Sequence, residues 1–260
     1  MRPQRPDPAG KKPEPAGIGR CNVCAYLESG SSEICYRCAR KKIESLAPFA
    51  QRCAICDLPL KPDGTCGNPL CNWHVSERYF EWNYAIAMRS GVLESAINAF
   101  KYENRRGWGK IFGRVLVGFL DEEEATFEDF DLIVASPTYL EPGSARKYDH
   151  TREVILAADE EAEGRWPFDT DGPPAIVKTA KTEPFVKKRW GERKKTAENE
   201  LRAALLIPDV SRTRGMEILV YDDVFTDGFT LREVARALIE EGGATKVCGV
   251  TLTRQPFRAK

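Results

Sequence analysis

The segment from Met216 to Glu241 constrains the fold more than any other part of the chain, because it predicts a strand, a loop and a helix in close succession. Ile218 to Tyr221 is a run of apolar and β-favouring residues, which is typical of a buried strand. Two adjacent acids, Asp222 and Asp223, follow where that strand should end. Beyond a loop, apolar residues at helical spacing form one stripe: Leu231, Val234, Ala235, Leu238 and Ile239.

This segment indicates a site for a phosphate and a sugar. Backbone N–H groups of a glycine-containing loop that opens a helix converge on an anion, and the helix dipole favours it. Carboxylates at the carboxyl end of a strand lie where open α/β sheets place ligands, and they suit ribose hydroxyls and magnesium. As a purely structural alternative, Thr230 and Glu233 form a capping box at the helix start. That alternative leaves the paired aspartates unexplained, since their burial without partners is costly.

The cysteines predict a separate metal-binding module, because eight of the nine lie between Cys21 and Cys71. Two Cys-x-x-Cys knuckles complete a tetrahedron around zinc, so we expect two structural zinc sites. Taken in sequence order, the two ligand sets are Cys21, Cys24, Cys35 and Cys38, then Cys53, Cys56, Cys66 and Cys71. A cross-braced arrangement that exchanges the middle knuckles is the alternative, and His74 is a second candidate in place of Cys71. We expect Cys248, in an apolar run, to be a buried thiol.

The rest of the composition bounds the domain organisation. Residues 1–20 are rich in proline and charge, which predicts a disordered tail before the cysteine module at 21–75 and a main domain at 76–260. Lysine plus arginine and aspartate plus glutamate both total 39, so net charge gives no argument for nucleic acid. No apolar run has transmembrane length and the N-terminus has no secretory pattern, so we expect a cytoplasmic protein with reduced thiols.

Further strands are predicted at Leu132 to Ala135, Ala175 to Lys178 and Lys246 to Thr253, with helices between them. Four strands separated by helices favour an open, mostly parallel α/β sheet. The aromatic residues between positions 79 and 84 are interpreted as a hairpin or a packing segment. The basic run from Lys178 to Lys195 has three interpretations: a solvated helix face, a mobile loop that closes over pyrophosphate, or a patch for nucleic-acid phosphates.

Ile218 to Thr230 reads ILVY-DD-VF-TDGFT and resembles the thirteen-residue phosphoribosyl pyrophosphate signature of type I phosphoribosyltransferases. That signature is four apolar residues, two acids, two apolar residues, then Thr-Thr-Gly-x-Thr. Asp227 departs from it, since the family usually has Thr or Ser there. With its cysteine knuckles and a SARKYDH segment that contains Arg146, the chain resembles the ComF family of predicted phosphoribosyltransferases, which is associated with competence and DNA uptake in bacteria.

The resemblance implies a type I phosphoribosyltransferase-like domain behind a zinc-ribbon-like module, and binding of phosphoribosyl pyrophosphate with Mg²⁺. Asp222 and Asp223 would hold the ribose hydroxyls and magnesium. The 5′-phosphate would lie against Thr226, Asp227, Gly228, Phe229 and Thr230. Pyrophosphate would be balanced by Arg146, Lys187 and Lys188. The alternative is a non-catalytic protein whose zinc knuckles and basic patch bind single-stranded DNA or a DNA-handling partner.

Overall fold

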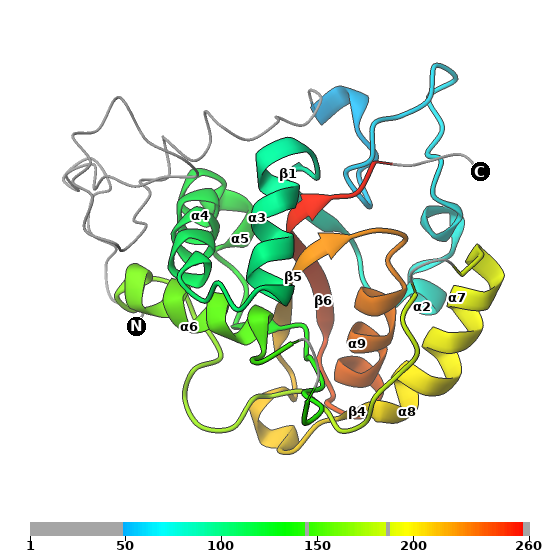
Figure 1. Ribbon diagram of the computed structural model, residues 1–260. Helices are drawn as coiled ribbons and strands as arrows, with labels where there is room; N and C mark the ends of the chain where they lie inside the picture. Colours follow the sequence, from blue (N-terminus) through cyan, green and yellow to red (C-terminus); the bar gives the residue numbers. More distant parts are fainter. Residues whose placement is uncertain (1–48, 144–145, 186–187, 257–260) are drawn as a thin grey trace, which may run out of the picture.

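The centre of the fold is a four-stranded parallel sheet. The computed structural model describes residues 49–143, 146–185 and 188–256 (Figure 1). Across the sheet the order is β1 (Asn83–Met88), β6 (Lys246–Arg254), β5 (Glu217–Phe225) and β2 (Leu132–Ala135). Every neighbouring pair is parallel, so each connection crosses over the sheet and carries helices with it. The expectation of a mostly parallel α/β sheet is confirmed.

Helices cover both faces of this sheet (Figure 1). One face carries α3 (Gly91–Tyr102), α4 (Trp108–Glu122), α5 (Glu124–Phe127) and α6 (His150–Ala162). Helices α4 and α6 approach so closely at Gly113 that an added Cβ would lie 2.7 Å from the Ala158 amide nitrogen. Alternate residues of β5 serve the two layers, because successive side chains of a strand point to opposite faces: Leu219 and Tyr221 pack on this side.

The opposite face carries α9 (Phe229–Glu240) and the helical segment before β5 (Figure 1). That segment consists of α7 (Trp190–Thr196), the π-helical turn η4 (Ala197–Leu201) and α8 (Arg202–Ala204). The core on this side also includes Cys53, Cys56, Leu58 and Leu70, which are buried with the apolar stripe of α9. The second cysteine set therefore packs into the same core as the predicted ligand-binding segment. Short elements complete the fold: η2 (Phe49–Gln51), η3 (Pro69–Asn72), α2 (Val75–Arg78) and η5 (Val210–Arg212).

One strand prediction holds only in part, and one strand of the main sheet was not predicted as such. The segment predicted at Ala175 to Lys178 contributes only β3 (Val177–Lys178), which pairs antiparallel with β4 (Leu205–Leu206) in a separate small sheet. The fourth strand of the main sheet is instead β1, whose start overlaps the aromatic segment interpreted as a hairpin or a packing segment. Its side chains alternate between buried and half-buried, and Trp82 and Tyr84 pack onto the core. None of the described helices is long and apolar enough to cross a membrane.

Candidate functional site

The acid pair lies at one end of the sheet, beside an open strand edge. Strand β2 pairs with β5 only as far as Tyr221, whereas β6 continues to pair with β5 as far as Phe225. The sequence placed Asp222 and Asp223 after the strand, but both lie within the last residues of β5. They extend beyond the end of the neighbouring strand β2. The Asp223 amide donates to the Asp222 carboxylate at 2.8 Å. The two side chains point to opposite faces of the strand and meet different partners.

Asp223 is held by two basic residues from two helices. Its side chain is 8% exposed, and its Oδ2 atom forms an ion pair with the Lys101 ammonium from the last turn of α3. His150, the first residue of α6, places Nε2 3.4 Å from the same oxygen. Burial acts to raise the pKa of Asp223, but the Lys101 and His150 charges and hydrogen bonds together hold that pKa well below its usual value. Burial in turn lowers the pKa of His150, whereas the charge of Asp223 and its hydrogen bond act to raise it.

Asp222 is in a different state, and it is partly exposed. Burial and the neighbouring Asp223 charge raise the pKa of Asp222 to about 7. Its carboxyl group therefore exchanges its proton near neutral pH, and it is the member of the pair that is available to a metal ion or to a sugar hydroxyl. The resemblance implies one role for both aspartates, whereas their surroundings differ in the structure.

The loop after β2 brings further cations to this end of the sheet. Asp149 caps α6 by accepting from the Arg152 amide at 3.0 Å, and it also accepts from the Thr138 amide at 3.3 Å, which closes the loop onto the helix. Within the loop, Arg146 donates to the Tyr102 hydroxyl at 3.3 Å and lies over its ring. The Arg146 charge contributes to lowering the pKa of both His150 and Lys178, after burial in each case. Arg146 thus acts electrostatically on His150, the residue that lies beside Asp223.

One of the other two predicted pyrophosphate residues, Lys188, is engaged elsewhere. Lys188 donates to the Thr196 hydroxyl at 2.6 Å and forms an ion pair with Glu183, so its ammonium is already engaged. Lys187 lies outside the described residues. Among the described residues, Arg146 is the pyrophosphate candidate whose charge acts on His150, the partner of Asp223.

The glycine loop opens α9, but not through the predicted capping box. The helix begins at Phe229, and Gly228 is its N-cap with a φ of 95°, so Thr230 is already inside the first turn. Glu233 is buried and forms an ion pair with Arg232 instead of reaching back to the helix start. Glycine is needed because a Cβ at position 228 would lie 2.6 Å from the Phe225 ring. The side chain of Phe229 is fully buried, so this residue offers a ligand only its backbone.

Asp227 turns towards the helix start and is neutralised there. Its Oδ2 atom lies 3.0 Å from Nη1 of Arg193, which comes from α7 in the basic run. Its Oδ1 atom accepts a long hydrogen bond, 3.4 Å, from the Phe229 amide. The residue that departs from the phosphoribosyl signature therefore uses one of the amides that a phosphate would use, and Arg193 balances its charge. Thr226 is exposed and Thr230 half-buried beside it.

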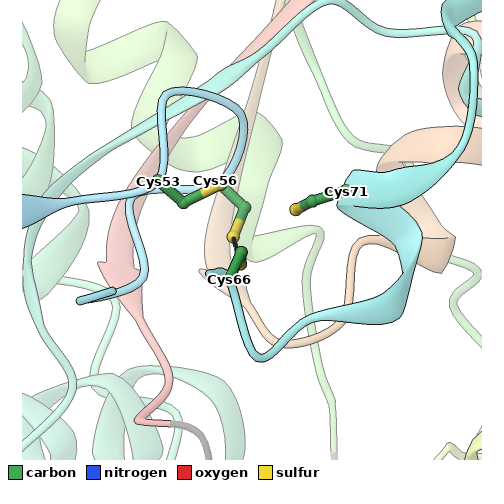
Figure 2. Close-up of side chains that lie close together, drawn as sticks. All are labelled: Cys53, Cys56, Cys66 and Cys71. Atoms are coloured by element: carbon green, nitrogen blue, oxygen red, sulfur yellow. Dashed lines mark hydrogen bonds between the residues drawn. The ribbon is translucent and has the colours of Figure 1, made fainter. Parts of the chain in front are cut away.

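Four cysteines form one cluster that can hold a metal ion such as zinc. Figure 2 shows Cys53 and Cys56 on one loop facing Cys66 and Cys71 on the following segment, and their sulfur atoms all lie within 4.8 Å of one another. The Cys56 and Cys66 sulfurs are 3.7 Å apart, close to the edge of a tetrahedron with zinc–sulfur bonds of about 2.3 Å. Backbone amides support the cluster: those of Ile55 and Asn68 each point to a sulfur at 3.4 Å.

This cluster confirms the grouping of the second cysteine set in sequence order. His74 is not part of it, because its side chain is exposed and caps α2 through the Ser76 amide. Cys248 is buried in the core, and burial raises its pKa to about 12, as expected of a structural thiol. The first predicted set, Cys21, Cys24, Cys35 and Cys38, lies outside the described residues.

Several residues of the site had no signal in the sequence. Lys101, His150 and Arg193 are far from the aspartates in the chain, and their helices bring them there. Comparison with models of known protein families and with curated proteins gives no match.

Proposed function

We propose that this chain binds phosphoribosyl pyrophosphate with Mg²⁺ in a type I phosphoribosyltransferase-like domain, as the resemblance to the ComF family implies. The observation that carries the proposal is the meeting of three features at one end of the sheet. These are the acid pair on β5, the glycine start of α9, and the cations Lys101 and Arg146. An open parallel sheet binds ligands outside the carboxyl ends of its strands, where all three lie.

Each part of the ligand has a matching group. Asp222 would bind Mg²⁺ or the ribose hydroxyls, because its carboxylate is partly exposed and not taken up by a cation. Asp223 would act through its fixed position, since Lys101 and His150 already bind it. The first-turn amides of α9 lack partners within the helix and would receive the 5′-phosphate, with Arg193 beside them.

For transfer, the bond between C1′ and the pyrophosphate oxygen would break, and pyrophosphate would leave with the electron pair. Positive charge then develops on the ribose ring, so positioning and charge stabilisation do most of the catalysis. Bound Mg²⁺ would supply positive charge beside the leaving group, and Arg146 and Lys187 would supply the remaining positive charge. An acceptor nucleophile completes the new bond at C1′.

Isothermal titration calorimetry tests the proposal. Wild-type protein should release or absorb heat with phosphoribosyl pyrophosphate in the presence of Mg²⁺, and the Asp222→Asn variant should lose most of that binding. Asp129→Asn is a matched control, because Asp129 is an exposed acid that precedes the start of β2, at the opposite end of the sheet. No heat with wild type, or equal binding by the Asp222→Asn variant, would remove the proposal.

A second candidate function, binding of single-stranded DNA, is favoured by a cavity away from the acid pair. It measures about 560 Å³ and lies between the cysteine segment, α7 and α9, lined by Trp73, Ser76, Glu77, Tyr79, Lys194, Glu198, Arg232 and Arg236. The Lys194 ammonium lies 4.7 Å from the centre of the Trp73 ring, and Arg236 lies 5.5 Å from that of Tyr79. Proteins that bind single strands combine aromatic rings, on which the bases stack, with cations that pair with the phosphates.

Fluorescence anisotropy with a labelled oligothymidylate separates this candidate from the first. Binding that weakens with salt, and that is lost in the Trp73→Ala variant, would support it. Lys181→Ala is a suitable control, because Lys181 belongs to the same basic run but is exposed and paired with Glu141. Absence of binding even at low salt would remove this candidate without affecting the first.

A further inference from the structure

We propose that the four-cysteine metal site positions the loop at the start of α9, through Arg254 and Asn68, so that metal loading of Cys53, Cys56, Cys66 and Cys71 sets the geometry of the ligand-binding loop. For the identity of the ligand this inference rests on the proposed function. For the positioning itself it rests on contacts between the cysteine segment and residues 225–228.

Arg254 is the main link. It ends β6, and although it carries a charge it is fully buried. Its Nε atom donates to the Cys56 carbonyl at 2.7 Å, and Nη2 lies 3.5 Å from the Cys56 sulfur. Its Nη1 atom donates to the Phe225 carbonyl at 2.9 Å and to the Thr226 carbonyl at 2.6 Å. One guanidinium therefore joins a candidate metal ligand to the last residue of β5 and the first residue of the loop.

Asn68 is a second link, and it lies within the cysteine cluster between Cys66 and Cys71. Its side chain is almost fully buried, and Nδ2 donates to the Asp227 carbonyl at 3.1 Å. Its backbone amide points to the Cys66 sulfur at 3.4 Å. The same residue thus contacts a metal ligand through its backbone and the loop through its side chain.

The loop also packs against this segment without spare room. An added Cβ at Gly228 would lie 3.0 Å from Cδ2 of Leu70, the residue before Cys71. A shift of the cysteine segment is therefore transmitted to the N-cap of α9. Interiors packed at this density pass displacements on to their neighbours rather than absorbing them.

The metal is what fixes the cysteine segment in this arrangement. Four sulfur atoms within 4.8 Å of one another are stable as thiolates only around a cation, because like charges at this separation repel. Without the metal, no coordination bonds join the pair Cys53 and Cys56 to the pair Cys66 and Cys71. The Cys56 carbonyl and Asn68 then lose their fixed positions, and the three carbonyls of residues 225, 226 and 227 lose the donors that order them.

Hydrogen–deuterium exchange on the full chain tests this positioning without any ligand. Zinc-loaded protein is compared with protein stripped by a chelator and with stripped protein reloaded with Zn²⁺ alone. We expect amide exchange in peptides that cover 225–231 to speed up at least tenfold on stripping and to recover on reloading, while β2 and the contact between α4 and α6 stay protected. Unchanged exchange in 225–231, or equal loss of protection throughout the sheet, would overturn the inference.

Matched variants assign the effect to this set of cysteines. Cys71→Ser disables the cluster and should reproduce the faster loop exchange, whereas Cys21→Ser, from the first predicted set, should not. Asn68→Asp keeps the acceptor that receives the Leu70 amide but removes the donor to Asp227. It should retain zinc by native mass spectrometry and still exchange faster in the loop. Equal effects of Cys71→Ser and Cys21→Ser, or an unaltered loop in Asn68→Asp with bound zinc, would contradict the assignment.

The ligand provides a second readout whose failure is distinguishable. Stripped protein should bind phosphoribosyl pyrophosphate with Mg²⁺ at least tenfold more weakly than zinc-loaded protein. Equal affinity of the two forms would refute the link between metal and ligand. If wild type binds none in either form, the proposed function is wrong, and the exchange experiment alone decides the positioning.

Discussion

The ion pair between Lys101 and Asp223 gives the sharpest test of how the candidate site is built. Both side chains are nearly buried, 13% and 8% exposed, and the carboxylate lies inside a strand of the central sheet. Replacing Lys101 by Met keeps most of the apolar stem and removes the charge. Asp223 would then retain His150 as its remaining polar partner, at 3.4 Å.

The expected loss of stability is large. Two unit charges about 4 Å apart attract by about 4 kcal/mol at the effective dielectric near a protein surface. Removing one partner of a buried pair costs about 3–5 kcal/mol, because the other charge remains buried without compensation. His150 offsets part of this, since Lys101 contributes to lowering its pKa and its loss makes protonation of the ring easier. We therefore expect Lys101→Met to lower the free energy of unfolding by about 3 kcal/mol at pH 8.

The sign of the pH dependence follows from the pKa of Asp223. The pKa is held below its unfolded value, so this group contributes stability above about pH 4 and loses it as pH falls through the folded pKa. Lys101→Met raises that folded pKa. The deficit of the variant should thus be greatest at pH 8 and shrink towards pH 5, where Asp223 or His150 takes up a proton.

Urea denaturation followed by tryptophan fluorescence measures this deficit at both pH values. The control is Lys181→Met, since Lys181 and its partner Glu141 are both exposed and such pairs contribute little. The double variant Lys101→Met/Asp223→Asn should be more stable than Lys101→Met alone, because no unpaired charge remains. Equal stability of Lys101→Met and Lys181→Met at pH 8, or a deficit that does not change with pH, would refute the electrostatic account.

Three other outcomes can be measured directly. Affinity for phosphoribosyl pyrophosphate with Mg²⁺, measured by calorimetry, should rise about tenfold from pH 6 to pH 8, because Asp222 ionises through a raised pKa of about 7, and an affinity that does not change with pH would contradict this. Ionisation of Asp222 also destabilises the unliganded fold, so the free energy of unfolding in urea should fall over the same range in wild type and not in Asp222→Asn. Asp227→Thr, which restores the signature residue, should tighten the same binding several-fold by freeing the Phe229 amide, and unchanged affinity in calorimetry would contradict this. Gly113→Ala should lower the free energy of unfolding by about 1–3 kcal/mol, because its Cβ would lie 2.7 Å from the backbone nitrogen of Ala158 in the facing helix. Urea denaturation measures this change, and a value near zero would contradict the close packing of the two helices.

Sequence reasoning succeeded where the signal is local. The apolar stripe of α9, strand β2 and the spacing of Cys53, Cys56, Cys66 and Cys71 are patterns within short windows, and the structure has each as expected. Strand β1 was missed for a physical reason. Its six residues alternate in burial, but the aromatic residues at its start dominate the pattern and suggest packing rather than a paired strand.

The environment of the acid pair was beyond such reasoning, because it depends on contacts between distant segments. Lys101 ends a helix whose pattern indicates only an amphipathic face, and His150 begins another. Arginine is usually a surface residue, yet the Arg254 side chain is fully buried among carbonyl groups. Only the register of β6 against β5 brings its guanidinium over the loop.

Asp227 shows how local and distant information combine in this site. Its carboxylate stands where the signature has a hydroxyl, so it would repel a phosphate bound there. Either the carboxylate points away from the phosphate, or it weakens phosphate binding. The structure excludes the first, since the carboxylate accepts from the Phe229 amide. Arg193 from α7 changes the consequence of the second, because it cancels the charge at 3.0 Å. A phosphate that approaches α9 therefore competes with Asp227 for one amide and one guanidinium rather than meeting a bare negative charge. Under the proposed function, Asp227 would have to turn aside for the phosphate, while Asn68 and Arg254 hold the backbone carbonyls of residues 226 and 227.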